Sequence, residues 1–258
     1  MASVRGLNYL STQTIPEPRL TDLRFMLHRF ALCAAFGAAV TASSAAADQP
    51  VVIELFTSQG CAACPPADEL LGQLSERSDV IPLALHVDYW DYIGWSDTFA
   101  QPAFTARQHG YGHAAGSSVV YTPQMVVGGV DHVVGYRPME VADLIAAHTA
   151  QPDPVEVSAE PQGGGWRVTA LWRGDGTAPQ MVVQLVAYSP AEEVDITRGE
   201  NAGLTTMYYN IVTSWQVVAE WGGDAPWQAQ VMPAAEAPHV VIVQSRDYGA
   251  ILGAERLE

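Results

Sequence analysis

Two cysteines separated by two residues, Cys61 and Cys64, are the part of this sequence that points most directly to chemistry. They lie between an apolar run of strand type, residues 51–56, and a helix-like stretch, residues 67–74. A cysteine at a helix N-terminus faces unpaired backbone N–H groups and the positive end of the helix dipole, which favour the reactive thiolate. The pattern predicts thiol–disulfide exchange, and we expect the Cys61 sulfur to be accessible to solvent.

Three other interpretations of the pair stay open. It could be half of a zinc site, completed by His86, His109, His113 or acids, or a copper site of two thiolates and one histidine. It could also be an inert structural disulfide. The sequence contains only one Cys-x-x-Cys, and its place between a strand and a helix favours the redox interpretation. We therefore predict no metal site and no cofactor.

A second candidate feature is the dipeptide formed by Thr122 and Pro123, just before a strand-like run that begins at Met125. In this topology the segment faces the cysteines, and we expect a cis peptide bond there. A proline has no N–H, so the space beside the sulfurs stays unobstructed, and the backbone of Thr122 can pair with an extended substrate. A trans-proline that starts an edge strand is the alternative.

A loop rich in acids and aromatic residues follows the strand predicted over residues 80–87. His86, Asp88 and Asp91 lie at the carboxyl end of that strand, where sites form in parallel sheets. We favour a hydrated rim with a hydrogen-bonded histidine over a role in proton transfer. The aromatic residues either hold an extended partner or cap the core, the commoner use; they are Tyr89, Trp90, Tyr92 and Trp95.

The elements that must position these residues alternate between strand and helix as far as about residue 150. We expect strands over 51–56, 80–87, 125–127 and 130–134, and helices over 67–74, over 99–109 and from Pro138 onward. Residues 151–154 have the composition of a linker. The later segments are strand-like with glycine turns, which suggests a β-sandwich; they are 155–157, 166–172, 181–188, 207–221 and 240–244.

The N-terminal segment has the pattern of an export signal. We interpret residues 1–25 as a non-native extension and 26–47 as a signal peptide, followed by domains at 48–150 and 151–258. Removal of the signal takes away Cys33 and leaves Cys61 and Cys64 as a pair in an oxidising compartment. We expect a periplasmic or secreted protein with no membrane span in the mature chain.

The charge of the chain limits its partners. The formal net charge is −16, and every basic residue apart from the histidines is arginine. This balance argues against nucleic acid and anionic membrane surfaces as partners, and the absence of lysine excludes Schiff-base chemistry.

Several motifs in order resemble the secreted bacterial thioredoxin-like proteins of domain-of-unknown-function family 1223. They are Glu54–Cys61, Cys64–Asp68, His86–Tyr92, Tyr121–Val127 and Arg198–Asn201. The resemblance implies export and a thioredoxin-like α/β N-terminal domain, with Cys61 attacking, Cys64 resolving and Pro123 as the cis-proline. Residues 198–203 we otherwise interpret as a turn with an internal ion pair.

These observations predict an exported thiol–disulfide oxidoreductase-like protein that acts on extracytoplasmic protein thiols or disulfides. Cys61, Cys64 and Pro123 form its catalytic site, and Thr122, Tyr121 and Trp90 bind substrate. The predicted fold class is a thioredoxin-like α/β domain followed by an all-β, sandwich-like domain. The alternative is a non-catalytic thioredoxin-like binding module for copper or a partner protein, with a structural disulfide. Ala62 and Ala63 replace the Gly-Pro usual in thioredoxins, so the direction of electron flow stays open.

Overall fold

The computed structural model describes residues 49–232 and 237–258. The predicted extension 1–25 and signal peptide 26–47, with Cys33, lie outside the described residues. Within the two described ranges, no helix has the length and apolar character needed to cross a bilayer.

The helices begin where the sequence places prolines. They are α2 (Pro65–Ser75), α3 (Pro102–Ala114) and α4 (Pro138–Thr149), with a 3₁₀ turn, η1 (Asp91–Ile93), between the second strand and α3. Each α-helix has proline at its first turn, where the missing N–H costs nothing and the fixed φ suits the helix.

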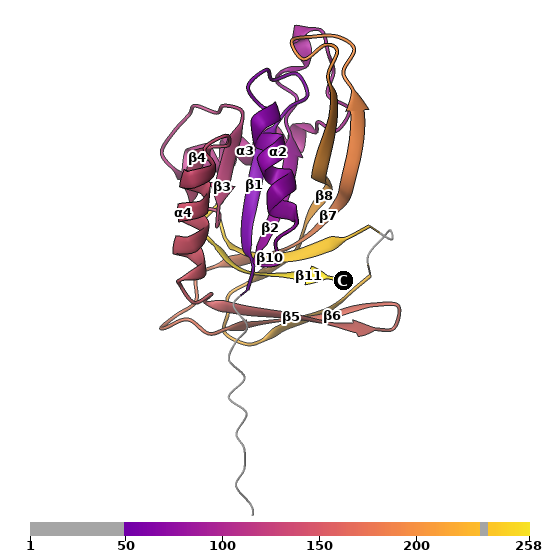
Figure 1. Cartoon of the computed structure of the whole chain (residues 1–258). Helices are drawn as coiled ribbons and strands as arrows, with labels where there is room; N and C mark the ends of the chain where they lie inside the picture. The colour runs from indigo at the N-terminus through magenta and orange to yellow at the C-terminus, as the bar shows by residue number, and fades with distance from the viewer. Residues whose placement is uncertain (1–48, 233–236) are drawn as a thin grey trace, which may run out of the picture. The chain divides into compact units, whose positions relative to one another are not determined.

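One eight-stranded mixed sheet forms the centre of the fold (Figure 1). From one edge to the other its strands are β11 (Ile251–Leu257), β10 (His239–Ser245), β7 (Met181–Asp195), β8 (Thr205–Trp221), β2 (Val80–His86), β1 (Val51–Thr57), β3 (Gln124–Val127) and β4 (Asp131–Val134). β1 and β2 are parallel, from Val51 opposite Val80 to Thr57 opposite His86. β7 and β8 form a long antiparallel hairpin.

Helices cover both faces of this sheet near β1. Alternate residues of the strand point to opposite faces, so Ile53 and Leu55 pack with α2 and α4, whereas Val52 and Phe56 pack with α3. Both faces of β1 are therefore buried, which explains why this strand is apolar along nearly its whole length.

The exception on β1 is Glu54, which is fully buried and paired with Arg107 of α3. Arg107 donates from Nε and Nη2 to the two carboxylate oxygens at 2.6 and 2.8 Å, and its guanidinium lies 3.7 Å from the ring centroid of Trp215. A buried charge must be paired and hydrogen-bonded to be tolerated. This pair therefore holds α3 in place against the sheet.

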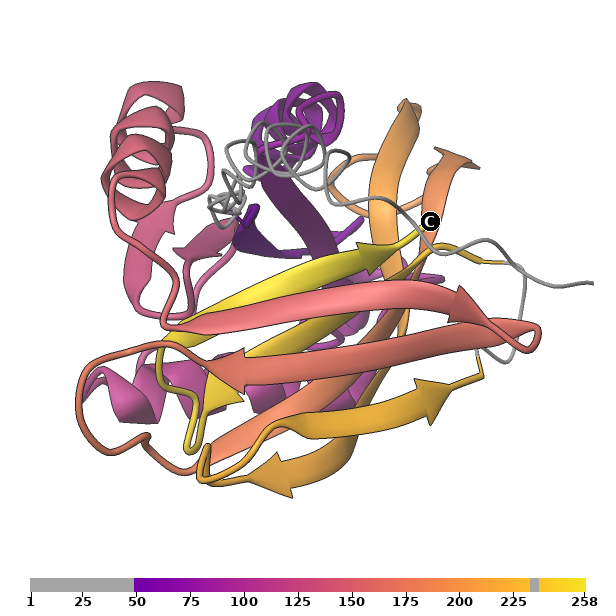
Figure 2. The same ribbon diagram turned by 90° about the horizontal axis from the view of Figure 1, so that it is seen from below.

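A second, three-stranded sheet packs against the C-terminal strands of the first. It contains β5 (Val155–Gln162), β6 (Gly165–Trp172) and β9 (Trp227–Val231). Figure 2 shows β5 and β6 in front of β10 and β11, running in nearly the same direction. The core between the two layers is rich in valine, with Val157, Val168, Val183 and Val243 among its buried members, and also contains Trp221.

The predicted fold class, a thioredoxin-like α/β domain followed by an all-β sandwich, is wrong. The structure is mostly β, with 43% strand and 19% helix, and strands from both halves of the chain enter the same large sheet. The described residues belong to one compact unit. The sequence boundary at residues 150 and 151 stays a prediction.

The joint that brings the two halves into one sheet is short. β8 meets β2 at a single ladder pair, Ala84 opposite Ile211. Beside it, Asn210 donates from Nδ2 to the carbonyl oxygen of Pro82 at 2.9 Å. Pro82 has no N–H to offer, so a regular ladder is interrupted here.

Candidate functional site

Cys61 and Cys64 form a disulfide at the start of α2, with their Cα atoms 5.4 Å apart. Cys64 is the N-cap residue, and its carbonyl oxygen accepts the N–H groups of Ala67 and Asp68 at 2.8 and 3.1 Å. The expectation that Cys61 is accessible to solvent is wrong for this state, because Cys61 is 2% exposed and Cys64 is 0% exposed. Ala62 and Ala63, which lie between them, are exposed. The tip of the loop therefore faces solvent, whereas the two cysteines are buried.

Hydrogen bonds fix the loop that precedes the disulfide. Cys61 donates its N–H to the carbonyl oxygen of Ser58 at 3.0 Å. Gln59 donates its N–H to Asp97 Oδ2 at 2.7 Å, and its side-chain oxygen accepts from Trp95 Nε1 at 2.8 Å. The segment around residues 95–98 therefore acts as a support for the cysteine loop.

Asp68, one helical turn after Cys64, is a buried carboxyl group behind the disulfide loop. It is 3% exposed, and its Oδ1 accepts from Thr57 Oγ1 at 2.7 Å. Burial raises the pKa of Asp68 to about 7, against the opposing effects of His86 and the Thr57 hydrogen bond. Its Oδ2 has no hydrogen-bond partner among the described residues.

A second buried acid lies near Asp68. Asp97 Oδ2 is 2.8 Å from His86 Nδ1, at the end of β2. Burial alone would raise the pKa of Asp97, but His86 and the N–H groups of Gln59 and Phe99 together lower it below its usual value. The two acids thus have opposite tendencies: at neutral pH Asp97 is ionised, whereas Asp68 is poised to gain or lose a proton.

The ring of His86 is enclosed by aromatic side chains. It makes edge contacts with Phe99 and Tyr208 at centroid distances of 5.2 and 5.1 Å. Its Nε2 is buried and has no hydrogen-bond partner among the described residues. The favoured interpretation of His86 as a hydrogen-bonded strand-end histidine is confirmed, with Asp97 as its partner.

Trp90 connects the cysteine loop with the predicted substrate segment. A Cβ placed on Gly60 would lie 3.3 Å from Trp90 Cβ, so the ring begins beside the residue that precedes Cys61. Trp90 Nε1 donates to Thr122 Oγ1 at 2.7 Å. The peptide bond between Thr122 and Pro123 is cis, as predicted. Cys61, Trp90 and Thr122 are therefore brought together in one region.

Pro123 lies against the first turn of α2. A Cβ placed on Gly135 would meet Ala67 Cβ at 3.0 Å and Pro123 Cβ at 3.1 Å, so both residues border the same glycine. Pro123 is buried. Tyr121 is 36% exposed, and its carbonyl oxygen accepts from Gln108 Nε2 at 2.8 Å.

The other polar and aromatic residues of the loop after β2 stabilise that loop. Asp88 accepts from Thr105 Oγ1 at 2.6 Å, and Asp91 accepts from Ser96 Oγ and from the N–H of Asp97, each at 3.0 Å. These bonds agree with the interpretation of the acids as a loop rim. Tyr89 and Trp90 pack against the core, whereas Tyr92 is 81% exposed.

Asn201 belongs to a segment that the sequence marks as a family motif and a turn, but its contact with the cysteine loop was not predicted. It lies in the turn between β7 and β8, and its Nδ2 donates to the carbonyl oxygens of Gln59 and Cys61 at 2.9 and 3.0 Å. The predicted ion pair within residues 198–203 does not occur among the ion pairs of the described residues. The segment instead contacts the cysteine loop, 140 residues earlier in the chain.

Metal binding finds no support in the side-chain geometry. Within residues 49–232 and 237–258, no three His, Cys, Asp or Glu side chains are grouped so as to hold a metal ion. His109 and His113 lie on consecutive turns of α3 with ring centroids 6.5 Å apart.

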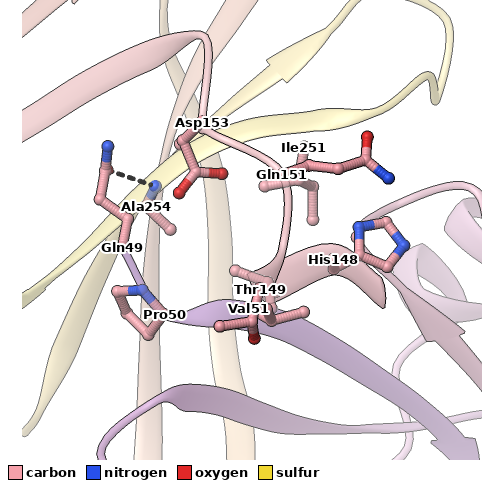
Figure 3. A pocket seen from close by; sticks show the side chains of 12 residues that line it. Gln49, Pro50, Val51, His148, Thr149, Gln151, Asp153, Ile251 and Ala254 are labelled. Atoms are coloured by element: carbon pink, nitrogen blue, oxygen red, sulfur yellow. Dashed lines mark hydrogen bonds between the residues drawn. The ribbon is translucent and has the colours of Figure 1, made fainter. Parts of the chain in front are cut away.

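One cavity lies between the start of β1, the end of α4 and β11 (Figure 3). Gln49, His148, Thr149 and Asp153 are among the residues that line it, and its volume is about 30 Å³. A space of that size holds a water molecule or two, far less than the several hundred Å³ of a ligand pocket. We therefore assign no ligand site there.

The missed residues differ in how visible they are from sequence. Asp68 follows Cys64 by four residues in a predicted helix, so its position one helical turn after Cys64 was in principle readable. Asp97 lies in an irregular loop, and Asn201 is brought in by a distant hairpin. Neither has a periodicity that could point to the cysteines.

Comparison with known proteins places the chain in a family. The family described as "Protein of unknown function (DUF1223)" matches residues 52–244. A crystal structure of a protein from Agrobacterium tumefaciens has a TM-score of 0.69 and 33% identity, covering 80% of this chain and 93% of that one. HBP35 of Porphyromonas gingivalis is similar in fold, with a TM-score of 0.60 and 14% identity over 81% and 75% of the two chains. None of the curated proteins matches. The chain therefore belongs to the DUF1223 family.

Proposed function

We propose that this protein carries out thiol–disulfide exchange through Cys61 and Cys64. The observation that carries the proposal is a disulfide at the N-terminus of α2 with a buried carboxyl group of pKa about 7 one helical turn behind it. The helix end stabilises a thiolate at this position. The carboxyl group can exchange a proton near neutral pH.

The reaction of the oxidised pair balances as follows. A substrate thiolate attacks Cys61 Sγ, the bond between Cys61 and Cys64 breaks, and Cys64 leaves as a thiolate. A second substrate thiolate then attacks the substrate sulfur of the mixed disulfide and releases Cys61. Two electrons pass from two substrate thiols to the cysteine pair, and their two protons end on the two cysteine sulfurs. The reverse sequence reduces a substrate disulfide.

Asp68 serves this reaction as an acid–base group of the α2 N-terminal turn. A neutral Asp68 carboxyl can supply a proton when Cys64 leaves as a thiolate, and an ionised one can take the proton when Cys64 attacks. The partner acid Asp97 is unsuited, because its lowered pKa and its bond to His86 keep it ionised at neutral pH.

The substrates are protein thiols or disulfides of the cell envelope, in a periplasmic or secreted setting. The proposal of an extended polypeptide substrate is supported by the position of Thr122, which Trp90 holds beside the cysteine loop. An extended substrate strand would pair with the Thr122 backbone and contact Tyr121 and Trp90. Pro123, Cys61 and Cys64 complete the proposed catalytic site.

The test compares catalysis of insulin reduction by the wild type with that of three variants. Cys61→Ser should abolish activity. Cys64→Ser should accumulate a mixed disulfide through Cys61, visible by mass spectrometry. Ala62→Ser adds the same hydroxyl at an exposed neighbouring position and should keep the wild-type rate. Equal rates for the wild type and Cys61→Ser would remove the proposal.

A second candidate is a binding module with a permanent structural disulfide. The burial of both sulfurs favours it. On this hypothesis Cys61→Ser loses stability but no activity, and the disulfide resists dithiothreitol in the folded protein. Measurement of the reduction rate under native conditions separates the two candidates.

A further inference from the structure

The turn between β7 and β8 reaches the disulfide loop from a distant part of the chain. We call residues 196–204 the hairpin tip. Figure 1 shows the two strands rising beside β2 and α2 toward the loops at the end of the sheet. At this end Asn201 bonds the carbonyl oxygens of Gln59 and Cys61. The carbonyl oxygen of Cys61 also accepts the N–H of Cys64 at 3.1 Å, so Asn201 bonds the turn that closes the disulfide.

The hairpin tip is a preformed turn with one polar side chain inserted into the cysteine loop. Its own bonds run from the N–H of Ile196 to the oxygen of Leu204 at 2.9 Å, and from the N–H of Gly203 to the oxygen of Ile196 at 2.7 Å. Asn201 is 6% exposed and Ile196 is 2% exposed, whereas the remaining residues of the tip are exposed or half-buried. Besides the two Asn201 bonds, the tip contacts the same region through Gly199, which lies close to Trp95. Loss of these few contacts would separate the tip from the cysteine loop while the pairing of β7 with β8 stays intact.

We propose that the hairpin tip is a latch on the disulfide loop, and that Asn201 is the positioning residue that keeps Cys61 out of reach of attacking thiols. Cys61 is 2% exposed while both Asn201 bonds are made. Nucleophilic attack needs a clear approach to Sγ along the disulfide axis. The loop must therefore open before it reacts, and loss of the Asn201 bonds shifts the balance toward the open form. As a gate for catalysis the latch rests on the proposed exchange function.

Dithiothreitol provides a test that does not depend on an unknown substrate. Its thiolate attacks Cys61 Sγ, the bond to Cys64 breaks, and the second thiol of the reagent displaces Cys61 and forms oxidised dithiothreitol. Both cysteines end as thiols, and two electrons pass from the reagent to the protein. The rate under native conditions reports how often the disulfide becomes accessible.

The variants are Asn201→Ala, which removes both donors, and Asn201→Asp, which places a carboxylate against two carbonyl oxygens. The matched control is Asn210→Gly. It removes one amide-to-carbonyl bond of the same hairpin, to Pro82, and glycine keeps the left-handed backbone of this residue, with φ of 46°. The Asn201 variants should react roughly tenfold faster than the wild type, because the loss of one or two hydrogen bonds changes an opening equilibrium by about that factor. Asn210→Gly should react at the wild-type rate.

Hydrogen exchange of the cysteine loop distinguishes the latch from a general loss of stability. In Asn201→Ala the amides of Cys61 and Cys64, which bond the oxygens of Ser58 and Cys61, should exchange faster, while those of β1 keep the wild-type rate. Equal or slower reduction in both Asn201 variants, or the same acceleration in Asn210→Gly, would overturn the latch.

The insulin assay separates this inference from the proposed function. If the Asn201 variants react faster with dithiothreitol but no variant reduces insulin, the latch stands and the exchange function fails. If the wild type reduces insulin and the Asn201 variants match it in both assays, the function stands and the latch fails.

Discussion

At the scale of single residues, two buried acids near one histidine have opposite protonation tendencies. Asp97 bonds His86 and two backbone N–H groups, which stabilise its charge. Asp68 accepts one hydroxyl bond from Thr57, and burial dominates its pKa. A carboxylate with few donors in a low-dielectric site favours its neutral form. The number of donors around each acid therefore explains the difference.

Replacement of Asp68 by Asn should make stability less dependent on pH. The native pKa of about 7 lies above the unfolded value of about 3.9, so the native state binds more protons and loses stability as pH rises between them. Asn keeps an oxygen for the Thr57 bond. The variant should gain stability relative to the wild type from pH 4 to pH 7, by about 4 kcal/mol at most. Urea unfolding across this range measures the gain.

Asp97→Asn is the control for that experiment, because the ionised form of Asp97 stabilises the native state, whereas the ionised form of Asp68 destabilises it. The native pKa of Asp97 is lowered, so its contribution to stability is present above the unfolded pKa and is lost as pH falls. Parallel stability profiles for the wild type and Asp68→Asn would show that Asp68 titrates normally in the native state.

At the scale of elements, α2 is fitted closely to β8. Gly72 on the helix faces Tyr209 on the strand, and a Cβ at residue 72 would lie 2.6 Å from the tyrosine ring. The small residue lets the helix that carries Cys64 approach the hairpin that carries Asn201. The position of the disulfide relative to the hairpin tip therefore depends on this glycine.

Gly72→Ala should destabilise the protein by about 1–3 kcal/mol, because the added methyl group overpacks the contact with Tyr209. Glycine inside a helix is ordinarily less stable than alanine by up to about 1 kcal/mol. In a Tyr209→Ala background the same change should become neutral or stabilising. Urea denaturation of the four proteins gives this cycle, and an identical loss in both backgrounds would exclude the ring as the cause.

Local elements were predictable from the sequence, and their assembly was not. The predicted strand 51–56 and the helix from Pro138 match β1 and α4, because their apolar spacing is strong and prolines mark helix starts. The sequence did not reveal β9 or β11 as strands. β2 meets β8 at one ladder pair with one Asn210 bond beside it, and neither leaves a pattern in sequence.

In the candidate site, too, local features were predictable and long-range contacts were not. The cysteine pair and the cis bond before Pro123 were predictable because each depends on residues that lie close together in the sequence. The burial of Cys61 was not, since the residues that bond its loop come from the distant loop after β2 and from the hairpin tip.

At the scale of the whole molecule, the two halves of the chain share a hydrophobic core. One buried cluster combines Val52, Leu83 and Phe104 from the first half with Val212 and Ile242 from the second. Neither half can bury these side chains by itself. Folding should therefore be a single cooperative event for the described part of the chain.

A fragment of residues 49–150 should not fold stably. Without β8 and β10 it leaves one side of β2 unpaired and exposes the apolar face that the shared core covers. Circular dichroism and amide dispersion of the fragment, compared with residues 49–258, check this expectation. A fragment with a cooperative thermal transition would instead support an autonomous domain that ends at residue 150.

The disulfide closes a ring between residues only three apart in sequence. Such a small ring removes little freedom from the unfolded chain, since the entropic gain of a cross-link grows with the length of the loop it closes. The stability of the fold therefore comes mainly from the burial of apolar side chains and from strand pairing. Chains synthesised in a reducing cytosol should reach the same tertiary structure as oxidised ones, with both thiols free.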